Sequence, residues 1–158
     1  MATRAWKAGP HEAETVARLL IGFRDHMGKT WPSDNAFLAG VENLLEDRNT
    51  EYVLGAVDED SPASGVVQLR FRQGIWRAGG DCLVEDVFVD ASARGHGVAR
   101  AMLELATERA LERGCRRMEL DVNEENPAAI ALYTSFGFTA GTPRDLYMRR
   151  HLDAGPDA

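Results

Sequence analysis

Apolar side chains recur at intervals of three and four residues in two segments near the N-terminus. In residues 11–27 this spacing joins Val16, Leu19 and Phe23, which is typical of an amphipathic helix. A second segment follows Ser33, a residue type that caps helices well, and continues to Leu45. The pattern therefore predicts two helices, each with one apolar face, ahead of the main strands.

Shorter apolar runs, bounded by Gly, Pro or acidic residues, are typical of β-strands. They predict strands over residues 3–8, 52–57, 65–71, 82–89, 118–122 and 146–150. The acidic, proline-containing segment between the second and third of these predicts a hairpin turn. The glycine-rich segment 72–80 interrupts the strand pattern, and Trp76 within it is interpreted as either a rim aromatic or a hairpin tip.

Two more helices are predicted in the C-terminal half, one over residues 99–113 with Gly114 as its cap and one over 128–135 after Pro127. The strand, helix and strand between residues 83 and 122 imply a parallel crossover, whereas the earlier strands are joined as a hairpin. The predicted fold class is α/β (α+β), with a mixed, mostly antiparallel twisted sheet and about four helices. We expect one domain over residues 1–152 and a frayed tail over 153–158.

Composition narrows the class of protein. The chain has 158 residues, of which 44% are hydrophobic and 27% charged, as in a soluble globular domain. Its formal charge of −7 disfavours nucleic-acid partners and mildly favours cationic ones. No apolar run approaches the ~18 residues of a membrane span, and the first ten residues lack a signal-peptide core. With only two cysteines, Cys82 and Cys115, these features predict a cytoplasmic protein without a membrane partner.

The run Arg94-Gly95-His96-Gly97-Val98-Ala99 stands between a predicted strand and a predicted helix. Glycines there accept positive φ and let an anion approach the main chain closely. The helix start adds free N–H groups and the positive end of the helix dipole. This pattern predicts a pyrophosphate-binding loop, although a Gly-x-Gly at such a turn also occurs as plain loop chemistry. The flanking residues must therefore decide.

Three motifs follow one another along the chain: Val84-Glu85-Asp86-Val87-Phe88-Val89-Asp90, the loop Arg94 to Ala99, and Asn126-Pro127-Ala128-Ala129-Ile130-Ala131-Leu132-Tyr133 followed by Phe136-Gly137-Phe138. Together they resemble the GNAT superfamily of acetyl-coenzyme A dependent N-acetyltransferases. The loop fits the family's Gln/Arg-x-x-Gly-x-Gly/Ala signature, and Ala99 stands where glycine is commoner. The resemblance is strong over about residues 50–150.

The resemblance implies that two central, neighbouring parallel strands splay apart and hold the pantetheine arm of acetyl-coenzyme A through the main chain of Val87 and Val89. The diphosphate would lie on the amides of the glycine loop, with Arg94 or Arg100 adding charge-assisted contacts. The residues expected at the cofactor are Val87, Phe88, Val89, Arg94, Gly95, His96, Gly97, Val98, Ala99, Arg100 and Asn126. Asn126 is interpreted either as a helix cap or as a cofactor contact. No metal is expected, because His96 has no second ligand at a binding spacing.

Transfer of an acetyl group to an amine requires that the ammonium first lose a proton. The resemblance places the base at Glu85, and the alternative is an edge carboxylate in a structural salt bridge. Strand alternation would turn Asp86 to the opposite face of the sheet. Tyr133 matches the tyrosine that the family uses to protonate the leaving thiolate, and the alternative is a core tyrosine. The N–H of Val87 would hold the oxyanion.

The acceptor is the least defined part of the prediction. Trp31, Asp34, Phe37 and Asp86 are candidate pocket residues, because an aromatic wall with carboxylates suits a cationic amine. The predicted reaction is direct attack by a primary amine of a small molecule or peptide in a ternary complex with acetyl-coenzyme A. The alternative is a noncatalytic acyl-coenzyme A sensor, and a dinucleotide module is disfavoured because the third glycine of Gly-x-Gly-x-x-Gly is missing. A homodimer is common among proteins resembling this one.

Overall fold

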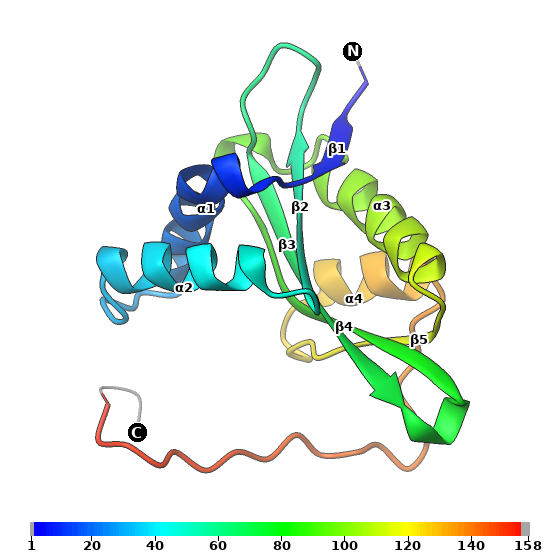
Figure 1. Cartoon of the computed structure of the whole chain (residues 1–158). Helices are drawn as coiled ribbons and strands as arrows, with labels where there is room; N and C mark the ends of the chain where they lie inside the picture. The colour runs from blue at the N-terminus through cyan, green and yellow to red at the C-terminus, as the bar shows by residue number, and fades with distance from the viewer. Residues whose placement is uncertain (1, 156–158) are drawn as a thin grey trace. The chain divides into compact units, whose positions relative to one another are not determined.

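The computed structural model describes residues 2–155, which fall into two compact units, Met1–Leu120 and Asp121–Ala158. The helices and strands of the first unit, drawn in Figure 1, are β1 (Arg4–Lys7), α1 (Ala13–His26), α2 (Asp34–Glu46), β2 (Thr50–Ala56), β3 (Gly65–Gly74), β4 (Gly79–Val89), α3 (Val98–Glu112) and β5 (Cys115–Leu120). The second unit contains α4 (Pro127–Ser135). The predicted tail lies partly outside the described residues, since 156–158 are not among them.

The first unit is built on one five-stranded sheet in the order β1-β2-β3-β4-β5. Neighbouring strands are antiparallel except β4 and β5, which run parallel. The predicted mixed, mostly antiparallel sheet is confirmed. Strand β5 begins three residues earlier than its apolar run indicated, because its first residues pair with β4 at Gly80 and Asp81 despite their polar side chains.

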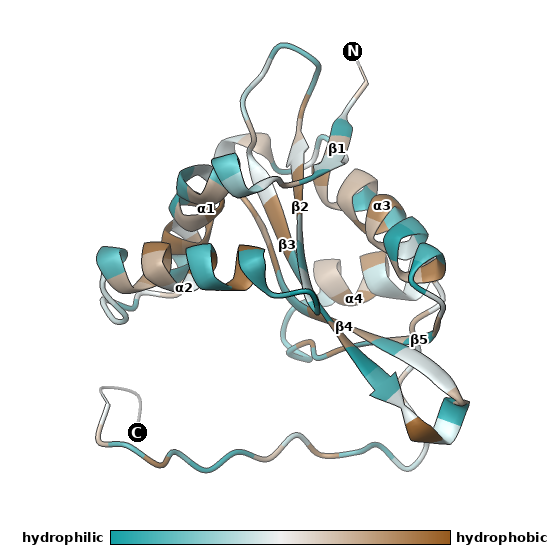
Figure 2. Ribbon diagram, in the orientation of Figure 1, coloured by the Kyte–Doolittle hydropathy of each residue, from teal (hydrophilic) through white to brown (hydrophobic). Residues whose placement is uncertain are grey.

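Helices cover both faces of this sheet. Helices α1 and α2 lie over one face, where Tyr52, Val66 and Phe88 belong to the core cluster that also contains Val16 and Leu19 of α1. Figure 2 shows hydrophobic colouring on β2 and β3 between α1 and α3. Burying the apolar stripe of each helix in this way is the main source of helix stability in a globular protein.

Helix α3 approaches the opposite face closely because two strand positions have no side chain. A Cβ atom at Gly55 or at Gly65 would stand only 2.7 Å from Met102 of α3 and 2.9 Å from Val98. Both of these α3 residues are fully buried. The first turn of α3 is therefore fixed against the sheet, close to the end of β4 from which the chain enters the glycine loop.

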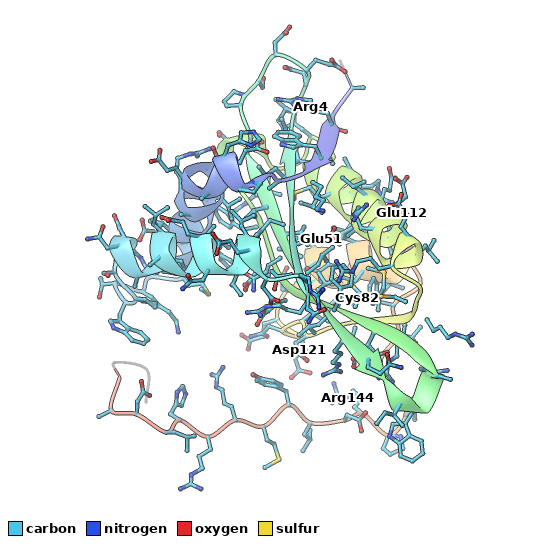
Figure 3. The ribbon with its side chains drawn as sticks, viewed as in Figure 1. Arg4, Glu51, Cys82, Glu112, Asp121 and Arg144 are labelled. Atoms are coloured by element: carbon cyan, nitrogen blue, oxygen red, sulfur yellow. The ribbon has the colours of Figure 1, made fainter. Side chains whose placement is uncertain are left out.

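Two connections in the first unit have clear local causes. The turn after β2 is formed by Asp58, whose side chain accepts hydrogen bonds from the amides of Asp60 and Ser61. Arg4, labelled in Figure 3, donates to the carbonyls of Asp58 and Ser61 and ties β1 to this turn. The N-cap predicted at Ser33 is confirmed, since its Oγ accepts from the amide of Ala36 at 3.2 Å.

Residues 72–80 continue the hairpin instead of breaking it. Pairing of β3 with β4 extends to Gly74 opposite Gly79, and a short 3₁₀ turn over Ile75–Arg77 joins the two strands. Trp76 stands at the tip and is 94% exposed, so the hairpin-tip interpretation is confirmed. The sequence prediction ended the strand early because this stretch is rich in glycine, whereas cross-strand hydrogen bonding uses the main chain and does not depend on apolar side chains.

The second unit differs from its prediction at one element. Helix α4 begins at Pro127 as expected and ends at Ser135, with Phe136 as its C-cap and Gly137 following at a φ of +90°. The strand predicted over residues 146–150 is wrong, because these residues adopt no regular structure, and Leu146 and Met148 are exposed. A strand needs a partner for its N–H and C=O groups, and a five-residue apolar pattern does not specify one.

Candidate active site

A β-bulge in β4 places the two acidic residues. Gln68 of β3 lies opposite Asp86, and the next residue, Leu69, lies opposite Val84, so Glu85 is the extra residue. The side chain of Gln68 donates to Glu85 while its backbone pairs with Asp86, which puts both carboxylates on the α1/α2 face of the sheet. The expectation that strand alternation turns Asp86 to the opposite face is therefore wrong, because a bulge breaks the alternation.

A chain of hydrogen bonds leads from the core to Glu85. The hydroxyl of Tyr52 on β2 donates to Oε1 of Gln68 at 2.7 Å. Nε2 of Gln68 donates to Oε2 of Glu85, and Nε of Arg70 donates to the same oxygen at 2.9 Å. Tyr52 and Gln68 are buried, whereas the side chains of Glu85 and Arg70 are 40% and 38% exposed. Glu85 thus stands at the boundary between core and solvent.

Asp86 occupies a different electrostatic environment. Burial raises the pKa of its carboxyl from 3.8 to about 6, the charge of Glu85 raises this pKa further within that total, and Arg70 opposes both. Within residues 2–155, no group donates a hydrogen bond to the Asp86 carboxylate. A half-buried acid that changes charge near neutral pH is a feature of catalytic clefts.

The outer edge of β4 opens beyond this bulge. Strand β5 pairs with β4 only as far as Val84 opposite Leu120, whereas β4 continues to Val89. The amide of Asp90 donates inward to the carbonyl of Ser64 at 2.8 Å, so by alternation the N–H groups of Val87 and Val89 point away from β3. In the first unit, the last part of β4 therefore has an edge that no strand covers, as a splayed parallel pair requires.

The glycine loop connects this edge to α3. Gly95 and Gly97 have φ values of +78° and +83°, and Gly97 is the N-cap of α3, with no side chain bonded to the helix start. A Cβ at Gly95 would meet no atom within 4 Å. The first N–H groups of this 15-residue helix thus have no side-chain cap at Gly97, and an uncapped helix start next to an open glycine is the geometry for binding an anion.

The other predicted loop residues have identifiable contacts. Nε of Arg94 donates to the carbonyl of Val89 at 3.0 Å, and its guanidinium lies 5.9 Å from the centre of the Phe88 ring. The Phe88 side chain belongs to the core, where it stacks on Phe23 at 5.3 Å. Nδ1 of His96 contacts two loop carbonyls at 3.0 and 3.2 Å, so this nitrogen carries the proton. The cofactor roles of these residues stay predictions.

Two predicted residues belong to the second unit. Oδ1 of Asn126 accepts from the amide of Ala129 at 3.2 Å, so the interpretation of Asn126 as a helix cap is confirmed. The ring of Tyr133 packs edge-on against Phe138 at 6.1 Å, and burial raises the pKa of its hydroxyl. A raised pKa keeps that hydroxyl protonated and able to donate. The assignments of Tyr133 to catalysis and of Asn126 to the cofactor stay predictions.

The candidate acceptor walls lie at the junction of α1 and α2. Asp34 is held by Arg24 at 2.8 Å, and the guanidinium of Arg24 lies over the ring of Phe37 at 5.7 Å. Phe37 packs against the core, whereas Trp31 is 47% exposed. Asp34 therefore has a structural partner already, and the acceptor roles of these residues stay predictions.

Sequence reasoning missed Tyr52, Gln68 and Arg70. All three lie in strands that were predicted, and Gln68 is a polar residue inside the apolar run Val66 to Phe71. A buried polar side chain needs a partner, so Gln68 was the available signal. Its partner depends on the register of β3 against β4, which the sequence does not display.

The described residues contain neither a cluster of metal ligands nor a membrane-spanning helix. No group of three or more His, Cys, Asp or Glu side chains between residues 2 and 155 is arranged to hold a metal ion. None of the described helices combines the length and the apolar character needed to cross a bilayer.

Comparison with known proteins relates this geometry to one family. The model of the acetyltransferase (GNAT) family matches residues 16–138. Glucosamine 6-phosphate N-acetyltransferase 1 of Oryza sativa subsp. japonica is 30% identical over 138 residues, covering 85% of this chain and 81% of that protein. The crystal structure of a suggested acetyltransferase from Arthrobacter sp. FB24 has a TM-score of 0.82 and 28% identity, covering 94% of this chain and 95% of that one.

A further solved structure, aminoglycoside N-acetyltransferase AAC(6')-Iy in complex with CoA, has a TM-score of 0.76. It is 20% identical, and the match covers 96% of this chain and 95% of that one. At this identity the similarity concerns the fold alone.

Proposed function

Because the chain belongs to the GNAT acetyltransferase family, we propose that it transfers an acetyl group from acetyl-coenzyme A to a primary amine of a small molecule or peptide. The observation that carries the proposal is the uncovered edge of β4 beyond Val84, which continues into the glycine loop and the start of α3. One continuous stretch of main chain thus offers strand-type hydrogen bonds first and anion-binding amides next, in the order in which pantetheine and diphosphate occur in the cosubstrate.

The residues present fit such a cosubstrate. The outward N–H group of Val89 would bond the pantetheine arm, as a strand edge bonds a neighbouring strand, and that of Val87 would face the thioester oxygen that becomes the oxyanion. The amides from Gly95 to Ala99 would bind the diphosphate, with the α3 dipole adding favourable charge. Substitution of Gly97 removes this fit, because its φ of +83° strains any L side chain.

The chemistry requires a base near the end of the thioester. An alkyl ammonium with a pKa near 10.4 is neutral about once in 2,500 molecules at about pH 7. Glu85 is the proposed proton acceptor, since it stands half exposed at the bulge that precedes the open edge. The neutral amine then forms the C–N bond as the C–S bond breaks. The leaving thiolate takes a proton from Tyr133 in this proposal, and the second proton that the new amide nitrogen loses restores the Tyr133 hydroxyl. The overall products are the amide, coenzyme A thiol and the one proton that Glu85 passes to solvent.

The first test measures thiol release from acetyl-coenzyme A with a panel of amines containing amino sugars, polyamines, aminoglycosides, lysine peptides and peptides with free N-termini. The proposal expects at least one amine to accelerate thiol release well above the rate of hydrolysis. Tight binding of coenzyme A with no acceleration by any amine would favour the noncatalytic sensor instead.

The second test addresses the glycine loop with a matched pair of variants. Gly97→Val and Gly114→Val both place a side chain at a left-handed glycine without a clash at Cβ, one at the start of α3 and one just after its end. We expect Gly97→Val to weaken coenzyme A binding by roughly tenfold or more in calorimetry, from strain and blocked approach. Gly114→Val should lower the stability of the protein and leave coenzyme A binding unchanged. Equal effects of both variants on binding would remove the loop from the proposed site.

A further inference from the structure

We propose that Gln68 and Tyr52 are positioning residues, which hold Glu85 so that its Oε1 atom faces the incoming amine. The inference rests on the proposed function, because it explains how the proposed base is aimed. It depends on the direction of the two hydrogen bonds that run from Tyr52 through Gln68 to Glu85.

The direction of the chain is fixed by chemistry. An ionised carboxylate only accepts hydrogen bonds, so Gln68 must turn its NH₂ group toward Glu85 and its Oε1 toward Tyr52. The hydroxyl of Tyr52 must then donate. Burial raises the pKa of Tyr52 above its ordinary value, so this hydroxyl keeps its proton near neutral pH. The buried end of the chain therefore has one stable arrangement.

The exposed end of the chain is asymmetric. Gln68 and Arg70 both donate to Oε2 of Glu85. Among residues 2–155, no group donates to Oε1 of Glu85. One oxygen is thus fixed by two donors, and the other keeps its lone pairs for a proton. Because a misplacement of about 1 Å can cost roughly a hundredfold in rate, fixing Oε2 is a means of aiming Oε1.

Titratable groups from three strands lie near this carboxylate. Arg70 comes from β3, Asp86 from β4 itself, and Tyr52 from β2. Helix α1 presents His26 to Phe88 and Arg18 to Asp90, further along β4. When Glu85 and Asp86 are both ionised, the positive charge of Arg70 balances only one of them. The bulge then keeps a net negative charge, which favours a cationic acceptor.

The step itself balances. The substrate ammonium gives a proton to Oε1 of Glu85, and the N–H bonding pair stays on nitrogen as the lone pair that attacks the acetyl carbonyl. Glu85 returns the proton to solvent after the product leaves. Gln68 and Tyr52 neither gain nor lose a proton in this step, and they act only by orienting Glu85. Their substitution should therefore lower kcat and leave the KM for acetyl-coenzyme A unchanged.

The experiment uses Gln68→Met and Tyr52→Phe, with Thr50→Val as the matched control. Thr50 lies on the same face of β2, and its buried hydroxyl donates to Asp47 at 2.8 Å, outside the chain to Glu85. We expect Gln68→Met to lower kcat by roughly ten- to a hundredfold and Tyr52→Phe by about threefold to tenfold. Thr50→Val should lower thermal stability similarly to Tyr52→Phe and leave kcat within about twofold.

A double-mutant cycle separates positioning from a general structural role. In the Glu85→Gln background, Gln68→Met and Tyr52→Phe should have no further effect on kcat, because they act only through Glu85. Independent, multiplying losses of kcat would overturn the inference. An active wild type with unchanged kcat in both variants would overturn it as well. A wild type that binds coenzyme A but acetylates no amine would instead contradict the proposed function.

Discussion

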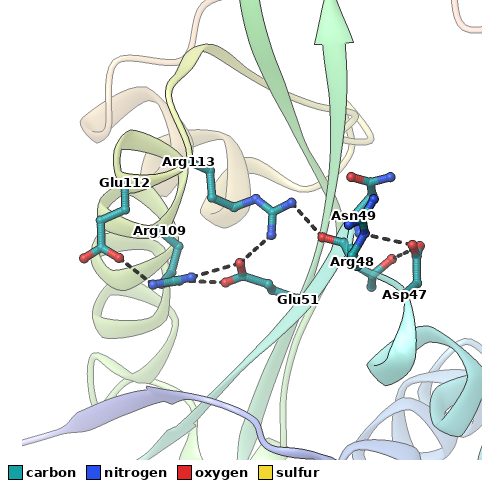
Figure 4. A network of polar contacts seen from close by, with 8 residues as sticks. Asp47, Arg48, Asn49, Glu51, Arg109, Glu112 and Arg113 are labelled. Atoms are coloured by element: carbon teal, nitrogen blue, oxygen red, sulfur yellow. Dashed lines mark hydrogen bonds and ion pairs between the residues drawn. The ribbon is translucent and has the colours of Figure 1, made fainter.

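Two glutamates on opposite faces of the sheet show how differently one residue type is used. Glu51 of β2 lies beneath α3 and is 3% exposed. Arg109 donates to both of its oxygens, at 2.6 and 3.0 Å, and Arg113 donates at 2.9 Å (Figure 4). Glu85 lies on the α1/α2 face, is 40% exposed, and has donors on one oxygen only.

The arginines around Glu51 are themselves held in place. Arg109 also pairs with Glu112, and Arg113 donates to the carbonyl of Arg48 and lies 4.0 Å from the centre of the Phe71 ring. Although burial raises the pKa of Glu51, the hydrogen bonds from Arg109 and Arg113 lower it below its ordinary value. A carboxylate saturated in this way locks the end of α3 to the sheet, whereas a carboxylate with one free oxygen is available for chemistry.

The largest expected effect is on the rate of acetyl transfer by Glu85→Gln. Removal of a general base lowers kcat by roughly a hundred- to ten-thousandfold. Coenzyme A affinity should stay within about twofold, because main-chain groups carry the proposed cofactor contacts, and unfolding should change little at a half-exposed site. The measurements are steady-state kinetics and calorimetry. A variant that keeps more than about half of the wild-type kcat would make Glu85 a structural carboxylate like Glu51.

The matching variant of the buried glutamate, Glu51→Gln, should lower the free energy of unfolding and leave kcat unchanged. It leaves two arginines facing a neutral amide in a buried site, and breaking such a cluster costs about 3 to 5 kcal/mol. Urea denaturation measures the loss of unfolding free energy, and kcat is determined at a temperature where the variant is folded. A normal stability with a reduced kcat would reverse the comparison between the two glutamates.

Asp86, the second carboxylate at the bulge, should make the stability of the protein depend on pH. The folded protein raises the pKa of Asp86 from 3.8 to about 6, so the folded state binds this proton more tightly than the unfolded state does. Its contribution to stability is complete below about pH 4 and is lost as pH rises to about 6. Asp86→Asn should therefore raise the unfolding free energy at about pH 7 by roughly 2 to 3 kcal/mol and have little effect at about pH 4.

The control for that measurement is Asp60→Asn, which removes the same charge from an exposed turn. Chemical denaturation curves for both variants and the wild type, taken across the pH range, give the comparison. An Asp86→Asn curve parallel to that of the wild type would mean that Asp86 is solvated and that the folded protein does not raise the pKa of its carboxyl.

The sequence predicted the parts of this site that local rules govern. The start of α3, predicted at Ala99 and found at Val98 after the N-cap Gly97, depends on glycine at the cap and on the apolar spacing that follows, both visible along a short segment. Glu85 was found through a motif. Its partners were not, because Gln68 is 17 positions away and reaches Glu85 only through the hairpin register. The bulge likewise arises between two strands, so neither strand alone indicates that Glu85 and Asp86 share a face.

The smallest expected effect concerns Arg70, whose ion pair with Glu85 is partly exposed on both sides. Such pairs contribute about 0.2 to 1 kcal/mol, and salt screens them. Arg70→Gln should therefore lower kcat by less than about fivefold, and its effect should shrink between about 0.05 M and 0.5 M salt, because the wild-type pair is itself weakened there. Gln68→Met should keep its full effect at both salt concentrations, since a buried amide is not screened. If Arg70→Gln matched Gln68→Met at high salt, the surface ion pair and not the buried chain would hold Glu85.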